Sequence, residues 1–177
     1  FTYEKGFAGS QNKYNFDYLG AKVTQDLALG NKGNLGVQVT AGKFFNAANI
    51  SFVDYKHFAG NQTRIGQTDN YLNVFNLMPY YTNSTNDAFF EAHSEYDDKG
   101  FIINKIPLLN KLKSNLMLGY HNLSVPNKMP YHEFSVGLDN LGFGKFKIFR
   151  LDYVRSYQNG FQGDGVIFGL KLLNILD

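Results

Sequence analysis

The chain of 177 residues has no cysteine and no tryptophan, only four prolines, and a net charge of only +2. The lack of cysteine excludes disulfides, thiolate metal sites and cysteine nucleophiles. The basic residues are scattered rather than clustered, which argues against a nucleic-acid partner. No apolar run approaches the roughly 18 to 20 residues that a membrane-spanning helix needs, so a chain of this kind would cross a bilayer only as a closed barrel.

What the sequence does contain is alternation of apolar and polar residues. Residues 34–45 place Leu35, Val37 and Val39 on one side and polar residues or glycines on the other, and residues 146–157 repeat the pattern. Side chains alternate across a strand, so this period of two predicts a sheet with one apolar and one polar face. A soluble sandwich would bury the apolar face, whereas a transmembrane barrel would turn it toward lipid.

The pattern predicts an antiparallel sheet of about seven or eight strands, joined by short Gly/Pro/Asn turns. The expected strands cover residues 14–29, 34–45, 88–98, 114–124, 131–141, 146–157 and 165–173. In the first of them the apolar positions change from even to odd numbers, which predicts a bulge at Gly20. A long loop at residues 46–87 interrupts the series, with residues 71–81 as a further candidate strand.

Three features favour lipid over a buried core. The predicted strands are about 10 to 12 residues long, against 5 to 6 in typical soluble sheets. Lys147 and Arg155 flank the apolar row of residues 146–157 at a separation of roughly 26 Å, so both could reach the interfaces. Tyrosines lie near strand ends, as in the aromatic girdles of membrane barrels. These tyrosines are Tyr80, Tyr81, Tyr96, Tyr131 and Tyr157.

These features predict an all-β fold, an antiparallel transmembrane β-barrel. Because the chain opens at Phe1 without an initiator methionine or an export signal, we expect residues 1–177 to be the C-terminal part of a larger exported barrel. The expected location is the outer membrane of a Gram-negative bacterium. Its expected partners are outer-membrane lipid and lipopolysaccharide, with other outer-membrane or periplasmic proteins as further candidates and no nucleic acid.

Long stretches from His57 onward support this prediction by resemblance. HFAGNQT, FNLMPYYTNSTNDAFFEAHSEYDDKGFIINKIPLLNKLK, YHEFSVGLDNLG and IFRLDYVRSY resemble the C-terminal region of a Bacteroidetes outer-membrane family. Its members pair an N-terminal carboxypeptidase-regulatory-like domain with a C-terminal barrel of unknown function. The most specific block is GFIINKIPLLNKLK, a connector that is either an amphipathic segment at the membrane interface or a packed turn.

A fainter resemblance concerns the BamA/TamA-type assembly barrels. Their penultimate strand carries an inward Arg-x-Asp, which Arg150 and Asp152 match, and their sixth loop folds into the lumen with an Arg-Gly motif. By this resemblance residues 46–87 fold into the lumen and five strands follow them. The corresponding loop motif departs from the family pattern because Ile65 separates its arginine from its glycine. The motif residues are Gly60, Asn61, Gln62, Arg64 and Gly66.

One predicted strand face carries Glu91, His93 and Glu95, spaced about 6.6 Å apart in succession. They could form a metal or acid–base site, but one histidine between two carboxylates is a poor ligand set. We therefore expect a polar lumen network and assign no catalytic, cofactor-binding or metal-binding residue. For Arg150 and Asp152 we expect an ion-pair lattice in the lumen wall. The alternative is that these two charges hold the inserted loop through Arg64 or through residues 60–62.

The function predicted from these features is that of an outer-membrane barrel without enzymatic activity or cofactor, acting in outer-membrane protein or lipoprotein biogenesis or transport. The alternative is a passive pore or a structural subunit of an outer-membrane complex. A third class is an outer-membrane hydrolase that uses Glu91, His93 and Asp97.

Overall fold

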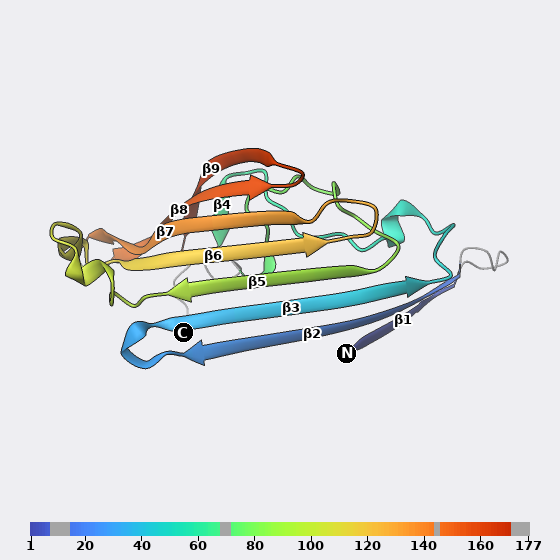
Figure 1. The fold of residues 1–177 in the computed structure, drawn as a ribbon, viewed down its shortest axis with the longest axis horizontal. Coiled ribbons are helices and arrows are strands. Elements are labelled where there is room, and N and C mark those ends of the chain that lie inside the picture. Colours follow the sequence, from blue (N-terminus) through green and yellow to red (C-terminus); the bar gives the residue numbers. More distant parts are fainter. Residues whose placement is uncertain (8–14, 68–71, 144–145, 171–177) are drawn as a thin grey trace.

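The structure is a computed structural model, and it describes residues 1–7, 15–67, 72–143 and 146–170. These residues form nine strands in a single sheet, which confirms the all-β prediction (Figure 1). The strands are β1 (Thr2–Gly6), β2 (Phe16–Ala28), β3 (Asn34–Phe45), β4 (Ile65–Gln67), β5 (Phe89–Asp97), β6 (Asn115–Ser124), β7 (Tyr131–Phe143), β8 (Phe146–Tyr157) and β9 (Phe161–Leu170). No helix in these ranges has the length and apolarity needed to span a membrane.

The sheet order is β1-β2-β3-β5-β6-β7-β8-β9-β4. All neighbours are antiparallel except β4, which lies parallel to β9. Five strands, β5 to β9, follow the long loop as predicted, and β3 and β8 have the predicted bounds. Within the described residues β1 pairs only with β2, and β1 and β9 are not neighbours, so the sheet is open.

The differences from the predicted strands have local causes. The short strands β1 and β4 were not predicted, because segments of five and three residues are too short to show a period. β9 begins at Phe161 instead of residue 165, because Asn159 and Gly160 both have positive φ and close a tight hairpin. The candidate strand at residues 71–81 does not form over residues 72–81, and Tyr71 lies outside the described residues.

The predicted bulge at Gly20 is wrong. The β2–β3 register runs without interruption from Asp17 opposite Phe45 to Ala28 opposite Asn34. The even-numbered aromatic residues of β2 are instead turned toward the long loop, which packs on that end of the sheet. The change of apolar parity therefore reflects a local covering layer rather than a kink. The register shifts that do occur lie between β7 and β8 and between β8 and β9.

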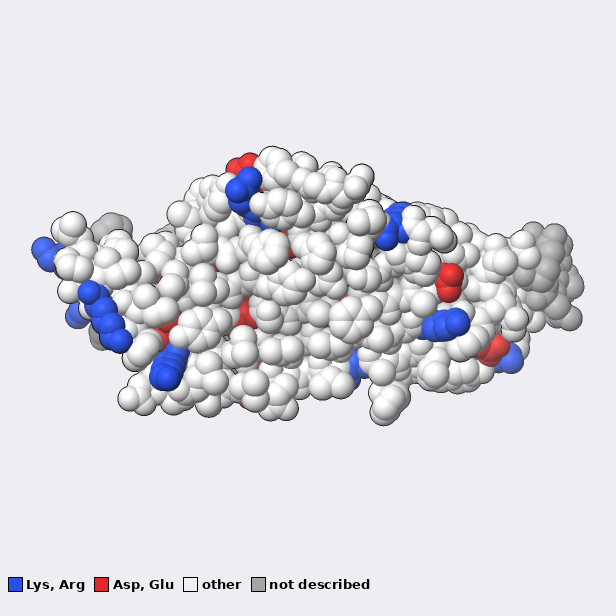
Figure 2. Space-filling model, in the orientation of Figure 1, with Lys and Arg blue, Asp and Glu red and all other residues white. Residues whose placement is uncertain are grey.

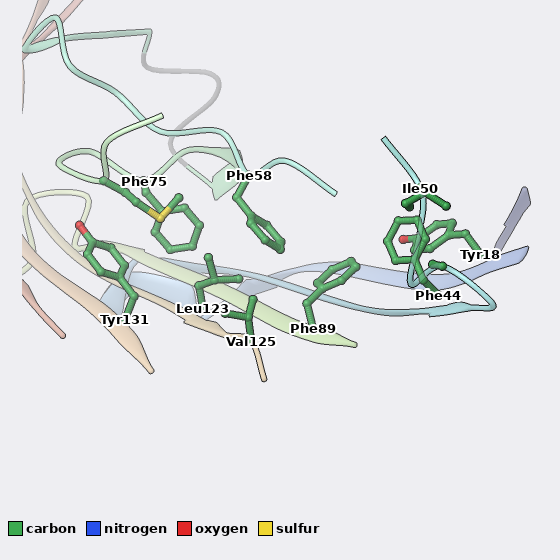
Figure 3. Packing of buried hydrophobic residues seen from close by; sticks show 11 residues of the cluster. Tyr18, Phe44, Ile50, Phe58, Phe75, Phe89, Leu123, Val125 and Tyr131 are labelled. Atoms are coloured by element: carbon green, nitrogen blue, oxygen red, sulfur yellow. The ribbon is translucent and has the colours of Figure 1, made fainter. Parts of the chain in front are cut away.

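Residues 46–67 and 72–87 of the long loop cover one face of the sheet, which we call the inner face; the opposite one is the outer face. Aromatic and aliphatic residues of the loop pack directly on strand residues (Figure 3). The ring centroids of Phe58 in the loop and Phe89 in β5 are 5.1 Å apart, and within the sheet those of Tyr18 and Phe44 are 4.8 Å apart. The cluster comprises Tyr18, Phe44, Ala47, Ile50, Phe58, Phe75, Met78, Phe89, Leu123, Val125 and Tyr131. Apolar burial thus fixes the loop against the strands.

The outer face has the opposite character. Its exposed large side chains include Leu19, Val23, Leu27, Phe45, Phe90, Leu118, Phe134, Val136, Phe149, Leu151, Tyr153, Val166, Phe168 and Leu170. Figure 2 shows this face: uncharged side chains cover its middle, and most charged atoms lie toward the two ends of the long axis. Tyr131, predicted for an aromatic girdle, is instead buried on the inner face in contact with the loop.

Candidate functional site on the inner face

Polar side chains occupy the middle of the inner face, on four consecutive strands. Alternation along β5 turns Glu91, His93 and Glu95 inward, and the antiparallel register places His93 directly opposite His121 of β6. His121 in turn lies opposite Glu133 of β7. These buried groups are neighbours because the sheet register aligns them.

Arg150 forms the centre of an ion-pair group. Its Nε and Nη2 donate to the two carboxylate oxygens of Asp152 at 2.7 and 2.9 Å, and Nη2 also donates to Glu95 at 2.7 Å. Arg150 is 1% exposed and Asp152 0%. The guanidinium donates two parallel hydrogen bonds to the buried carboxylate of Asp152. This bidentate geometry offsets part of the free energy that is needed to remove both charges from water. The structure thus places Arg150, Asp152 and Glu95 in one ion-pair lattice.

Glu91 and His93 belong to a separate chain of contacts. Glu91 Oε1 lies 3.0 Å from His93 Nε2, and His93 Nδ1 lies 2.7 Å from His121 Nδ1. Two facing ring nitrogens can hydrogen-bond only if one carries a proton and the other accepts it. Among the described residues His121 Nε2 is buried without a hydrogen-bond partner. His121 is isolated in the sequence and was therefore assigned no role there; it lies 28 positions from His93, and only strand pairing joins them.

Glu133 is the residue that holds the loop backbone, and sequence analysis missed it as well. Its carboxylate accepts hydrogen bonds from the backbone N–H groups of Asn76 at 2.6 Å and Leu77 at 2.8 Å. The hydroxyl of Tyr131 donates to the same carboxylate at 2.6 Å. Alternation within residues 131–141 could have marked Glu133 as an inward carboxylate, but not which segment it contacts.

Further contacts extend the attachment of the loop. The Phe75 ring packs on His93, with centroids 4.8 Å apart, and on Tyr131 at 5.7 Å. Gln38 of β3 donates to the carbonyl oxygen of Leu72 at 3.0 Å. The loop is therefore bound along its length to strands β3, β5 and β7 rather than at one point.

The predicted loop motif lies against the last strand. The guanidinium of Arg64 lies over Gly165, where an added Cβ would come within 2.0 Å of Nη1. The N–H of Phe168 donates to the Arg64 carbonyl oxygen at 2.9 Å, and Gly66 lies within β4, which pairs with β9. Among the remaining motif residues, Gly60 allows the backbone to approach the Met78 carbonyl.

Asn61 shapes the motif through its side chain. Its Oδ1 accepts from the Thr63 N–H at 2.8 Å, and its Nδ2 donates to the Ile65 carbonyl at 3.1 Å. This is an Asx turn, which reverses the chain without regular secondary structure. Gln62 projects from it into solvent.

The three hydrolase candidates do not form one group, because Glu91 contacts His93 but Asp97 lies apart from both. Asp97 is four residues beyond His93 on the same strand, a separation of about 13 Å. Its carboxylate accepts from the N–H of Lys99 at 2.8 Å and the amide of Asn115 at 3.3 Å. Within the described ranges, no group of three or more histidine, aspartate or glutamate side chains is arranged to hold a metal ion. The arrangement is suited to binding the loop and balancing buried charge.

Comparison with known protein families gives a match over most of the chain. Residues 1–138 match a family described as "Family of unknown function (DUF5686) C-terminal domain". The chain belongs to this family. The DUF5686 match covers the loop, the histidine pair and Glu133, whereas Arg150 and Asp152 lie beyond it. No curated protein and no solved structure matches the chain.

Proposed function

We propose that this DUF5686 domain forms part of the wall of an outer-membrane β-barrel, with residues 46–87 folded into the lumen. It acts without enzymatic chemistry, in the biogenesis or transport of outer-membrane proteins or lipoproteins. The observation that carries the proposal is the inverted polarity of the sheet, in which charged side chains are buried and large apolar ones are exposed.

Strand β8 shows this inversion residue by residue. Phe149 is 51% exposed and Leu151 39%, whereas Arg150 and Asp152 between and beside them are at most 1% exposed. Monomeric soluble proteins rarely expose a contiguous apolar surface larger than a few hundred Å². Hydrocarbon chains would solvate this outer row without cost, and the inner charges would face a polar lumen.

Strand dimensions support the same proposal. β8 has 12 residues, so it is about 40 Å long and spans about 28 Å of membrane thickness at a tilt of 45°. The sheet leaves room for further strands at β1 and along the part of β9 that β4 does not pair, as the resemblance to larger Bacteroidetes barrels implies. The biogenesis role rests on the resemblance to assembly barrels, in which an inward Arg-x-Asp accompanies an inserted loop.

Lipid exposure of the outer face can be measured directly, because the chain has no cysteine of its own. Spin labels are attached to Phe149→Cys and Leu151→Cys variants of the full-length protein in lipid vesicles. We expect collisions with lipid-soluble oxygen to exceed those with a water-soluble nickel chelate. A label at Gln162→Cys, at an exposed site beside the β8–β9 hairpin, is the matched control and should show the reverse order. Greater nickel accessibility at both outer positions would refute the membrane assignment.

The biogenesis role needs a cellular test. Depletion of the protein should lower the levels of other outer-membrane proteins or lipoproteins, measured by quantitative proteomics of the outer membrane. Unchanged levels would count against this role. Conductance in planar bilayers separates it from a passive pore, because a lumen filled by residues 46–87 should conduct poorly.

A further inference from the structure

The connector between β5 and β6, residues 98–114, carries several lysines that form no ion pair with the described residues of the sheet. It contains two 3-10 turns, Ile103–Lys105 and Leu109–Leu112. Four exposed lysines lie along it with no acidic residue between the first of them and residue 114; they are Lys99, Lys105, Lys111 and Lys113. Blue atoms predominate in Figure 2 at the left end, where Figure 1 shows this connector.

The nearest carboxylates in sequence do not neutralise these lysines. Asp98 accepts the backbone N–H groups of Gly100, Ile102, Ile103 and Leu116 at 2.7 to 3.1 Å. Asp97 accepts from a backbone N–H and from an asparagine side chain. In the part of the chain that the structure describes, none of the four ammonium groups lies within 4.0 Å of a carboxylate oxygen.

Large apolar side chains are exposed among the lysines. Ile106 and Leu112 are exposed, and Leu108 reaches 77%. Leu108 also has φ 75° and ψ −47°, close to the classic γ-turn, which is rare and strained. Below it, Ile103 is buried and Lys105 lies 3.7 Å above the Phe101 ring. The connector thus holds a leucine outward on an anchored turn, at a conformational cost.

Hydrogen bonds from one lysine join the second 3-10 turn to the start of β8. Lys147 lies at the start of β8, two residues before the exposed Phe149, in the stretch where the β7–β8 register shifts. Its ammonium group donates to the carbonyl oxygen of Leu112 at 3.1 Å and also to that of Lys113. The second 3-10 turn therefore lies at the rim of the sheet beside the start of β8, where Phe146 and Phe149 are exposed.

We propose that this connector docks on the head-group surface of a bilayer rich in anionic phospholipid. Its leucines enter the boundary between head groups and acyl chains, and its ammonium groups bind lipid phosphates. The inference rests on the proposed function, because the outer face must lie in lipid for the rim to meet the head groups. An acidic protein surface would match the charge but would not account for exposed leucines beside the apolar outer face.

The test places an environment-sensitive fluorophore at Leu108→Cys in the full-length protein, reconstituted in vesicles that contain a lipid-attached quencher. One set of vesicles is phosphatidylcholine alone, and the other includes phosphatidylglycerol. We expect stronger quenching and a blue-shifted emission with phosphatidylglycerol, both reduced by added salt. Adding Lys111→Gln and Lys113→Gln should lower the partition of the connector into these vesicles by about fivefold per lysine.

Two controls keep the outcomes separate. Lys43→Gln removes an exposed lysine of β3 outside the connector and should leave the signal at position 108 unchanged. A fluorophore at Phe149→Cys should be quenched in both kinds of vesicle. If position 149 is quenched and position 108 stays in water in both vesicles, the connector proposal is overturned while the membrane assignment holds, and a protein partner becomes the better occupant. If position 149 is not quenched either, the proposed function itself fails.

Discussion

Replacing Glu133 by glutamine tests how the loop is held to the wall. The carboxylate accepts three donors, two from the loop backbone and one from Tyr131. Glutamine has nearly the same shape, but it presents an NH₂ group where one oxygen accepted an N–H, so at least one buried donor loses its partner. Hydrogen bonds to charged groups contribute about 1.5 to 3 kcal/mol, so we expect local opening to become about 2 kcal/mol easier.

Hydrogen exchange of the full-length protein measures this change. A loss of 2 kcal/mol raises the local opening equilibrium about 30-fold, so the amides of Asn76 and Leu77 should exchange about 30-fold faster. Strand amides of β5 to β7 should keep their rates, because the ladder hydrogen bonds are untouched. Glu95→Gln is the matched control, since it removes a carboxylate of the same wall that bonds to Arg150 and not to these amides. Equal exchange at Asn76 and Leu77 in wild type and Glu133→Gln would refute the reasoning.

Three further predictions concern other parts of the fold. Burial raises the pKa of Asp98, but four backbone N–H donors lower it more, so the pKa lies below its usual range. The stability that Asp98 contributes is then complete above about pH 4 and is lost as the pH falls through the lowered pKa. Asp98→Asn should unfold about 2 kcal/mol more easily at pH 7, and the difference from the wild type should shrink as the pH falls below about 4. A difference that stays constant over that fall would contradict this. Arg150→Met leaves the carboxylates of Asp152 and Glu95 unpaired and should lower the free energy of unfolding, measured by denaturant titration, by about 3 to 5 kcal/mol. Arg150→Lys keeps the positive charge and should lower it less. Equal losses of unfolding free energy in the two variants would argue against the bidentate pair. Gly165→Ala should displace the Arg64 side chain and speed hydrogen exchange of the Phe168 amide. Gly163→Ala should not, because a Cβ added at that position meets no atom within 4 Å. Identical exchange rates in the two variants would show that Arg64 does not support the contact between β4 and β9.

Alternation of apolar and polar residues was sufficient to locate most strands. It failed in β2, where the loop covers one end of the inner face and apolar side chains are therefore buried on that face. Residues 34–45 and 146–157 form β3 and β8 at their predicted bounds, because apolar and polar side chains alternate along most of each segment. In β2 the same reasoning produced a false bulge, because Phe16 and Tyr18 pack in or against the core under the loop. A sequence pattern records which side chains are apolar, not what covers them.

In the candidate site, too, the sequence predicted which side chains point inward but not which of them are in contact. Glu91, His93, Glu95, Arg150 and Asp152 could be assigned to inward positions from period two alone. Their partition into an arginine lattice and a histidine chain required the strand register, which joins residues up to 55 positions apart. The contacts of Glu133 with the loop depend on a segment without regular secondary structure, so no periodicity could have predicted them.

The amino-acid sequence by itself determined that this protein is a sheet of long strands with one apolar and one polar face, because side chains of a strand alternate regardless of their surroundings. Only the tertiary structure decided which face is covered and which residues of the wall hold the covering loop. The reason is that these contacts arise from the register of neighbouring strands and from the path of the loop over residues 46–67 and 72–87. Both depend on packing between segments that are far apart in the sequence.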